Sequence, residues 1–182
     1  MRTDTTPAAL PGTIVLTEIR GPLGLLVGLG QLLTRDGSRY THAGICVGDG
    51  TVIEAHPRGV RVVQMSEYLD GRAIAFGWMI PLSAGRRARI VEEAQALIGA
   101  RYNWLDYVSL GLTHFGIRPG FVARRIARSD RLICSQLCDT AYLRAGIHLF
   151  DDGRAPGDVT PGDLANLFIE QNWALHQGWT ST

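Results

Sequence analysis

Lysine is absent from this sequence: all 18 basic residues among its 182 residues are arginine. A coding bias of a GC-rich genome explains this absence better than any chemical need. Acidic residues number 17, so the formal net charge is only +1. The chain therefore has no excess charge that would recruit nucleic acid or an acidic membrane surface, and we expect no nucleic-acid partner.

Cysteine is also scarce, with only Cys46, Cys134 and Cys138 in the whole chain. An odd number of cysteines without framework spacing argues against a disulfide scaffold, and no zinc-binding pattern of cysteine and histidine is present. The sequence therefore predicts free thiols. It gives no reason to expect a metal ion or another cofactor.

Long hydrophobic runs are missing as well. The first twelve residues contain no apolar core of the kind that a secretory signal has. The most apolar run, residues 21–33, is too short and too rich in glycine to span a bilayer, so a buried or interfacial helix is expected there. We therefore predict no transmembrane segment, and a cytoplasmic or virion-associated location.

What the chain does contain is typical of a globular protein, with 46% hydrophobic and 19% charged residues. Its length suits one domain with a substantial core. We expect residues 1–10 to be a flexible N-terminus and residues 11–182 to form a single domain. The sequence shows no internal repeat, low-complexity segment or interdomain linker.

Residues 132–146, LICSQLCDTAYLRAG, predict a helix that begins near Cys134 and stops at Gly146. Its apolar positions recur at helical spacing, at Leu137, Ala141 and Ala145. In the first turn of a helix, unpaired backbone N–H groups and the helix dipole favour a thiolate over a thiol. Cys134 is thus a candidate nucleophile, although a free cysteine is also a common buried residue. Cys138, one turn later, is interpreted as packing.

Residues 40–55, YTHAGICVGDGTVIEA, predict a β-hairpin closed by a three-residue loop, residues 48–50. This register places His42 and Glu54 on one face, close enough for a hydrogen bond. It places four apolar residues on the other face: Ala43, Ile45, Ile53 and Ala55. A two-residue loop would shift the register by one and separate His42 from Glu54.

These residues suggest a nucleophile, a general base and an orienting group, which is the basis of triad chemistry. His42 would take the proton of Cys134 and later protonate the leaving group, while Glu54 would orient the imidazole. The backbone N–H of Cys134 is a candidate oxyanion donor. Other interpretations stay open: His42 could be a core histidine, Glu54 a solvated strand residue, and His56 the base or the third member.

The remaining pattern predicts alternating strands and helices. Strands are expected at residues 13–19, 59–65 and 73–82, and helices at 83–98, 103–112 and 160–171. A basic segment, from Arg118 to Arg131, is expected to be helical over residues 121–131. Such runs are more often a solvated face than a binding site, so its role stays open.

The hairpin, the segment CSQLCDTAYLRAG and the later TPGDL together resemble the circularly permuted branch of the NlpC-like papain-fold cysteine peptidases. That branch includes bacterial permuted amidases and the lecithin:retinol acyltransferase group, and the likeness extends over residues 11–167. It implies an α+β papain-like domain, in which an antiparallel sheet or small barrel packs against the helix of the nucleophile.

The resemblance places Cys134, His42 and Glu54 on the nucleophile, the base and the third polar member of the family. It makes the hydroxyl of Tyr40 a candidate further oxyanion donor. This sequence departs from the family at two positions. Gln136 stands where many members have glutamate, and Cys138 is an additional thiol.

The expected function is thus thiol-dependent hydrolysis of amide bonds without a cofactor, with peptidoglycan peptides as the first substrate class. A lipid amidase or acyltransferase is the alternative enzyme. An idle structural component of a phage tail or another assembly is the alternative outside enzymes, and it would have a virion or assembly partner. The sequence does not decide between peptide and lipid substrates, between hydrolysis and acyl transfer, or between oligomeric states.

Overall fold

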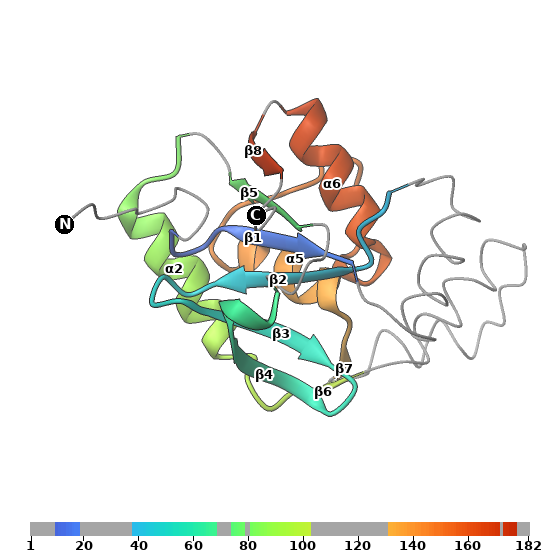
Figure 1. Cartoon of the computed structure of the whole chain (residues 1–182). Helices are drawn as coiled ribbons and strands as arrows, with labels where there is room; N and C mark the ends of the chain where they lie inside the picture. Colours follow the sequence, from blue (N-terminus) through green and yellow to red (C-terminus); the bar gives the residue numbers. More distant parts are fainter. Residues whose placement is uncertain are drawn as a thin grey trace, which may run out of the picture.

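The computed structural model describes residues 10–18, 38–68, 74–78, 81–102, 131–171 and 173–177, and these form an α+β fold (Figure 1). Its main feature is a six-stranded sheet with the strand order β4-β3-β2-β1-β5-β8, in which every neighbouring pair is antiparallel. The strands are β1 (Ile14–Thr17), β2 (His42–Cys46), β3 (Thr51–His56), β4 (Gly59–Gln64), β5 (Ile74–Trp78) and β8 (Ala174–Gln177). Two short strands, β6 (Arg101–Tyr102) and β7 (Arg131–Leu132), form a separate parallel pair.

The β2–β3 hairpin has the predicted register. Ile45 pairs with Ile53, and the N–H of Val47 bonds to the carbonyl of Thr51 at 3.0 Å. The three-residue loop contains two glycines with positive φ, Gly48 at 108° and Gly50 at 83°. A side chain at such angles would be strained, so the glycines fix the loop length and therefore the register.

The two faces of the sheet carry separate hydrophobic clusters. The four residues predicted for the apolar face of the hairpin all lie in the main core, together with residues of three helices. The opposite face, which carries His42 and Glu54, has a smaller cluster: Val15, Cys46, Val52, Val63, Tyr68, Ile74 and Phe76. The hairpin is therefore buried on both sides, and this burial holds its polar residues in place.

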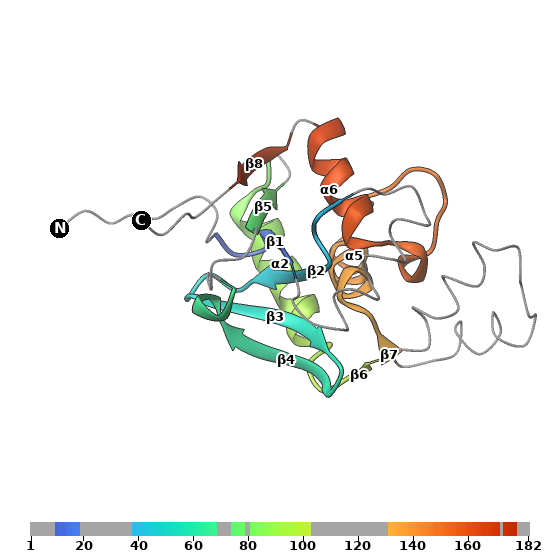
Figure 2. The ribbon, with the colours of Figure 1, turned by 45° about the vertical axis from the view of Figure 1, so that its right-hand side comes forward.

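Three helices cover the main-core face: α2 (Ala84–Gln95), α5 (Cys134–Arg144) and α6 (Pro161–Glu170). Figures 1 and 2 show α5 behind the middle of the sheet, with α2 and α6 on either side of it. Two of these helices begin with a side-chain cap, because Ser83 accepts from the N–H of Arg86 and Thr160 from the N–H of Asp163. Two 3₁₀ turns, η2 (Met65–Glu67) and η3 (Pro156–Asp158), complete the described elements.

Strand β8 was not expected from the sequence. It pairs with β5 through Phe76 and His176, and so extends the sheet by one strand beyond the predicted strands. Several predictions lie outside the described residues: the flexible N-terminus up to residue 9, the apolar helix at 21–33, the helix at 103–112 and the basic segment before residue 131. Within the described residues, no helix is sufficiently long and apolar to cross a membrane.

Candidate active site

Cys134 is the first residue of α5, as the sequence predicted. The preceding residue, Ile133, is the N-cap and has an extended backbone. Its N–H donates to Oε1 of Gln136 at 3.4 Å, so the neutral side-chain amide of Gln136 caps the start of the helix. A glutamate at this position would add a negative charge beside the thiol. Gln136 adds none, which favours a thiolate at Cys134.

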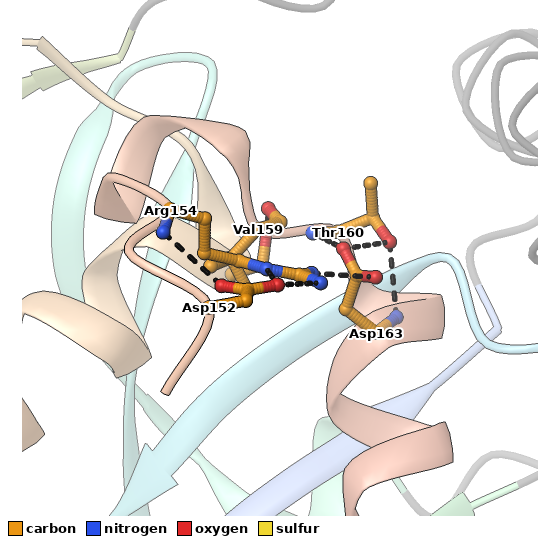
Figure 3. A network of polar contacts seen from close by, with 6 residues as sticks. Asp152, Arg154, Val159, Thr160 and Asp163 are labelled. Atoms are coloured by element: carbon orange, nitrogen blue, oxygen red, sulfur yellow. Dashed lines mark hydrogen bonds and ion pairs between the residues drawn. The ribbon is translucent and has the colours of Figure 1, made fainter. Parts of the chain in front are cut away.

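The start of α5 is also tied to the start of α6. Ser135, next to Cys134, donates its hydroxyl to the carbonyl of Val159 at 2.5 Å. Val159 precedes Thr160, whose side chain and backbone form a capping box with Asp163. Arg154 joins Asp163 at 2.9 Å and Asp152 at 2.6 Å, so one polar network links these segments (Figure 3). Two helix starts thus hold the backbone at Cys134 in place.

His42 stands between Cys134 and Glu54. Its Nε2 lies 2.7 Å from Oε2 of Glu54, and its side chain also hydrogen-bonds to Cys134. Because Nε2 of His42 bonds to Glu54, we assign the hydrogen bond with the Cys134 thiol to the other ring nitrogen, Nδ1. Burial opposes protonation of the ring, but the hydrogen bonds and negative charges of Cys134 and Glu54 raise the pKa of His42 from 6.5 to about 9. An imidazolium–thiolate pair is therefore favoured at neutral pH.

Glu54 has hydrogen-bond partners on both carboxylate oxygens. Oε2 also accepts from the hydroxyl of Tyr68 at 2.5 Å. Oε1 accepts from Nε and Nη2 of Arg61, at 2.9 and 2.8 Å. Burial would raise the pKa of Glu54, but His42, Tyr68 and Arg61 together lower it to about 2. Glu54 is thus a fixed negative charge, although only 5% of it is exposed.

Tyr68 and Arg61 were missed by sequence reasoning. Tyr68 follows η2, lies 3% exposed in the smaller cluster and stacks on His42 with ring centroids 5.9 Å apart. Space for its hydroxyl exists because residue 44 is glycine, where a Cβ would come within 3.1 Å of that oxygen. Arg61 could have been found, because it directly faces Glu54 once β3 and β4 are paired. No spacing pattern in the sequence predicts that Tyr68 contacts Glu54.

Two further predicted site residues, His56 and Tyr40, belong to the same chain segments as Glu54 and His42. His56 is the last residue of β3, and its Nδ1 accepts from the N–H of Arg58 at 3.2 Å. Burial and then the charge of Arg61 lower the pKa of His56, in contrast to that of His42. Tyr40 is buried in the main core, two residues before His42, and burial raises the pKa of its phenol. Its part as an oxyanion donor stays a prediction.

The other two thiols, Cys46 and Cys138, are also buried. Burial raises the pKa of Cys46 to about 12. Burial, followed by the charge of Cys134, raises the pKa of Cys138 well above its usual value. Both thiols therefore stay protonated at neutral pH and are poor nucleophiles.

We accordingly expect iodoacetamide at pH 7 to modify Cys134 first, by at least about tenfold over either other thiol. Peptide mass mapping after timed quenching measures the three rates in one sample. The variant Cys138→Ala is the matched control and should label at the same rate as the wild type. Faster labelling of Cys46 or Cys138 would remove Cys134 from the role of reactive thiol.

Among the described residues, no group of three or more histidine, cysteine, aspartate or glutamate side chains is arranged to hold a metal ion. Glu54 would be the natural carboxylate ligand, but both of its oxygens already accept hydrogen bonds from His42, Tyr68 and Arg61. The donor set at Cys134 therefore fits hydrogen-bonded acid–base chemistry better than metal binding.

The sequence matches no known family model and has no significant match among curated proteins. Among solved structures, the chain is similar to one described as the metalloprotein yiiX (DUF1105) of Escherichia coli O157:H7. The two share 18% sequence identity with a TM-score of 0.57, over 89% of this chain and 82% of the other. At this identity the likeness concerns the fold.

Proposed function

We propose that this chain is a thiol-dependent hydrolase that cleaves amide bonds through Cys134, His42 and Glu54. The observation that carries the proposal is the placement of His42, which bonds to Cys134 on one side and to Glu54 at 2.7 Å on the other. Residues from three separate elements, α5, β2 and β3, meet there. The papain-like assignment of the fold belongs to the same proposal, and the antiparallel sheet packed against α5 supports it.

The proposed reaction begins with the Cys134 thiolate and the His42 imidazolium. The sulfur attacks the carbonyl carbon of the amide, and the carbonyl oxygen gains the negative charge, which the backbone N–H of Cys134 stabilises. His42 donates its proton to the leaving nitrogen as the C–N bond breaks. An amine departs and a thioester remains on Cys134.

Water completes the cycle. The oxygen of a water molecule attacks the thioester carbon while His42 accepts a proton from that water. The C–S bond then breaks and a carboxylic acid is released. The returning thiolate and imidazolium restore the starting state. Glu54 keeps its charge throughout and stabilises the protonated ring, because its low pKa prevents it from taking the proton. An acceptor alcohol or amine in place of water would turn the same steps into acyl transfer.

Peptidoglycan peptides are the first substrate class that we propose, because the family resemblance lies mainly with enzymes that cleave cell-wall peptides. The neighbour yiiX is described as a metalloprotein, but the proposed steps use no metal, since the described residues around Cys134 do not fit one. The idle structural component is disfavoured by the site itself. A non-catalytic assembly protein gains nothing from a buried ion-paired network centred on a histidine and a cysteine.

A substrate panel tests the proposal. Wild type and Cys134→Ser would be incubated with muropeptide fragments and, separately, with N-acyl lipid amides, and the products identified by mass. Muropeptide cleavage by the wild type alone is the expected result. Cleavage of lipid amides only would favour the lipid amidase. Absence of turnover on both classes, together with unreactive Cys134, would favour the structural component.

A further inference from the structure

The side of Arg61 that faces away from Glu54 is exposed and held in one orientation. A guanidinium has five N–H groups. Glu54 accepts hydrogen bonds from one N–H of Nε and one of Nη2, at 2.9 and 2.8 Å, so three N–H groups remain. The side chain is nevertheless 45% exposed, although it bonds to a carboxylate that is 7% exposed. Arg61 therefore presents oriented donors to solvent without a further loss of side-chain entropy.

Other donors surround Arg61 at the β3–β4 turn. Arg58 lies in the turn itself and is exposed, and within the described residues its guanidinium has no ion pair. Its backbone N–H bonds to Nδ1 of His56, so the neutral ring of His56 carries its proton on Nε2 as a donor. The charges that act on His56 come from Arg61, Arg58 and His42, against one acid, Glu54.

Strand β6 brings one more arginine to this turn. The N–H of Val60 bonds to the carbonyl of Ala100 at 2.9 Å, and a Cβ on Gly59 would lie 3.0 Å from the same oxygen. The next residue, Arg101, is exposed. Arg101 is therefore beside the turn, although it is more than forty residues away in the sequence. Elsewhere, the exposed Arg89 is neutralised by Glu92 and Glu93, whereas Arg58 and Arg101 have no such ion pair among the described residues.

We infer that Arg61, Arg58 and His56, with Arg101 beside them, form a binding site for an anionic group of the substrate, a carboxylate or a phosphate. Guanidinium N–H groups match the oxygens of both anions. The inference rests on the proposed function for its substrate, but the binding of the anion does not require turnover. It concerns residues that take no part in bond cleavage, except that Arg61 also holds Glu54.

The geometry also gives the spacing of the substrate. Arg61 and His42 bond to opposite oxygens of the Glu54 carboxylate, and His42 bonds to Cys134. The Glu54 carboxylate and the His42 imidazole lie between the Arg61 guanidinium and the Cys134 sulfur. We therefore estimate that these two groups are on the order of 10 Å apart, about the length of three extended residues. The favoured substrate therefore carries its negative charge about three residues from the scissile amide.

The kinetic test uses two peptides that differ only at one end, a free carboxylate against a carboxamide, about three residues from the scissile bond. Wild type should show a KM about tenfold lower for the carboxylate. Arg58→Gln and Arg101→Gln should raise the KM for the carboxylate peptide, so that the ratio of the two KM values falls from about tenfold towards one. Arg144→Gln, at the other end of α5, is the matched control and should keep the full preference. An equal loss in Arg144→Gln, or no preference in the wild type, would overturn the inference.

A binding test separates this inference from the proposed function. In Cys134→Ser, backbone amides of residues 56–61 would be followed by NMR during titration with the carboxylate peptide, the carboxamide peptide and glycerol phosphate. Saturable shifts with either anion but not with the carboxamide are expected, even if the wild type cleaves nothing. The tighter anion identifies a peptide or a lipid headgroup as the source. Equal shifts with the neutral peptide would contradict the anion site while leaving the hydrolase proposal intact.

Discussion

Cys134→Ser is expected to lower turnover by on the order of 10⁵-fold and to leave the fold intact. Serine has nearly the shape of cysteine, which matters because Cys134 is 1% exposed within the main core. Its hydroxyl, however, does not ionise at neutral pH, so the thiolate–imidazolium pair is lost. Turnover of the cleaved substrate, with thermal melts in parallel, measures both effects.

His42→Ala should reduce turnover about as much as Cys134→Ser, and the double variant should be hardly worse than either. A nucleophile and its base act as one unit, so their losses do not add. Cys138→Ala is the matched control, because it removes another buried thiol of the same helix, whose pKa burial raises well above its usual value. It should retain kcat. Full activity in Cys134→Ser, or additive losses in the double variant, would contradict the assignment.

Glu54→Gln is expected to leave partial activity, lower by about 100-fold, and to move the alkaline limit of the pH–activity profile. His42 has a raised pKa of about 9 because of Cys134 and Glu54. The active imidazolium is therefore present below about pH 9 and is lost as the pH rises through that value. Removing the negative charge of Glu54 lowers this pKa, so the alkaline limb should shift to lower pH.

The control for this variant is Glu67→Gln, a nearby glutamate in η2 that is exposed. It should keep both the rate and the alkaline limb of the wild type. Stability should fall in Glu54→Gln alone, because Arg61 loses its buried counterion and Tyr68 its charged acceptor. An unmoved alkaline limb in Glu54→Gln would mean that Glu54 does not act on His42.

The register of the β2–β3 hairpin and the start of α5 could be predicted from the sequence because both depend on local geometry. Gly48 and Gly50 fix the hairpin loop, and period-two alternation then places His42 and Glu54 on one face. The start of α5 at Cys134 is equally local, because it follows from helical spacing up to a glycine stop. Short-range rules of this kind need no knowledge of the tertiary structure.

The rest of the site depends on contacts between distant segments. Tyr68 reaches Glu54 only because η2 turns back over the sheet and Gly44 leaves space for its hydroxyl. The pairing of His42 with Cys134 joins residues more than ninety positions apart. The pairing of β8 with β5 is similarly distant, and nothing near Trp173 signals that a strand follows. Such contacts depend on how whole helices and strands pack together, which local sequence patterns do not predict.

The most direct test of the account is the titration of His42, because it requires no substrate. The imidazole of isotopically labelled protein would be followed by NMR from pH 5 to 11, in the wild type and in Cys134→Ser. The account predicts a pKa of about 9 in the wild type and a clearly lower value in the variant, since the charge and hydrogen bond of Cys134 both favour the protonated ring. A wild-type pKa near 6.5, or the same pKa in both proteins, would contradict it.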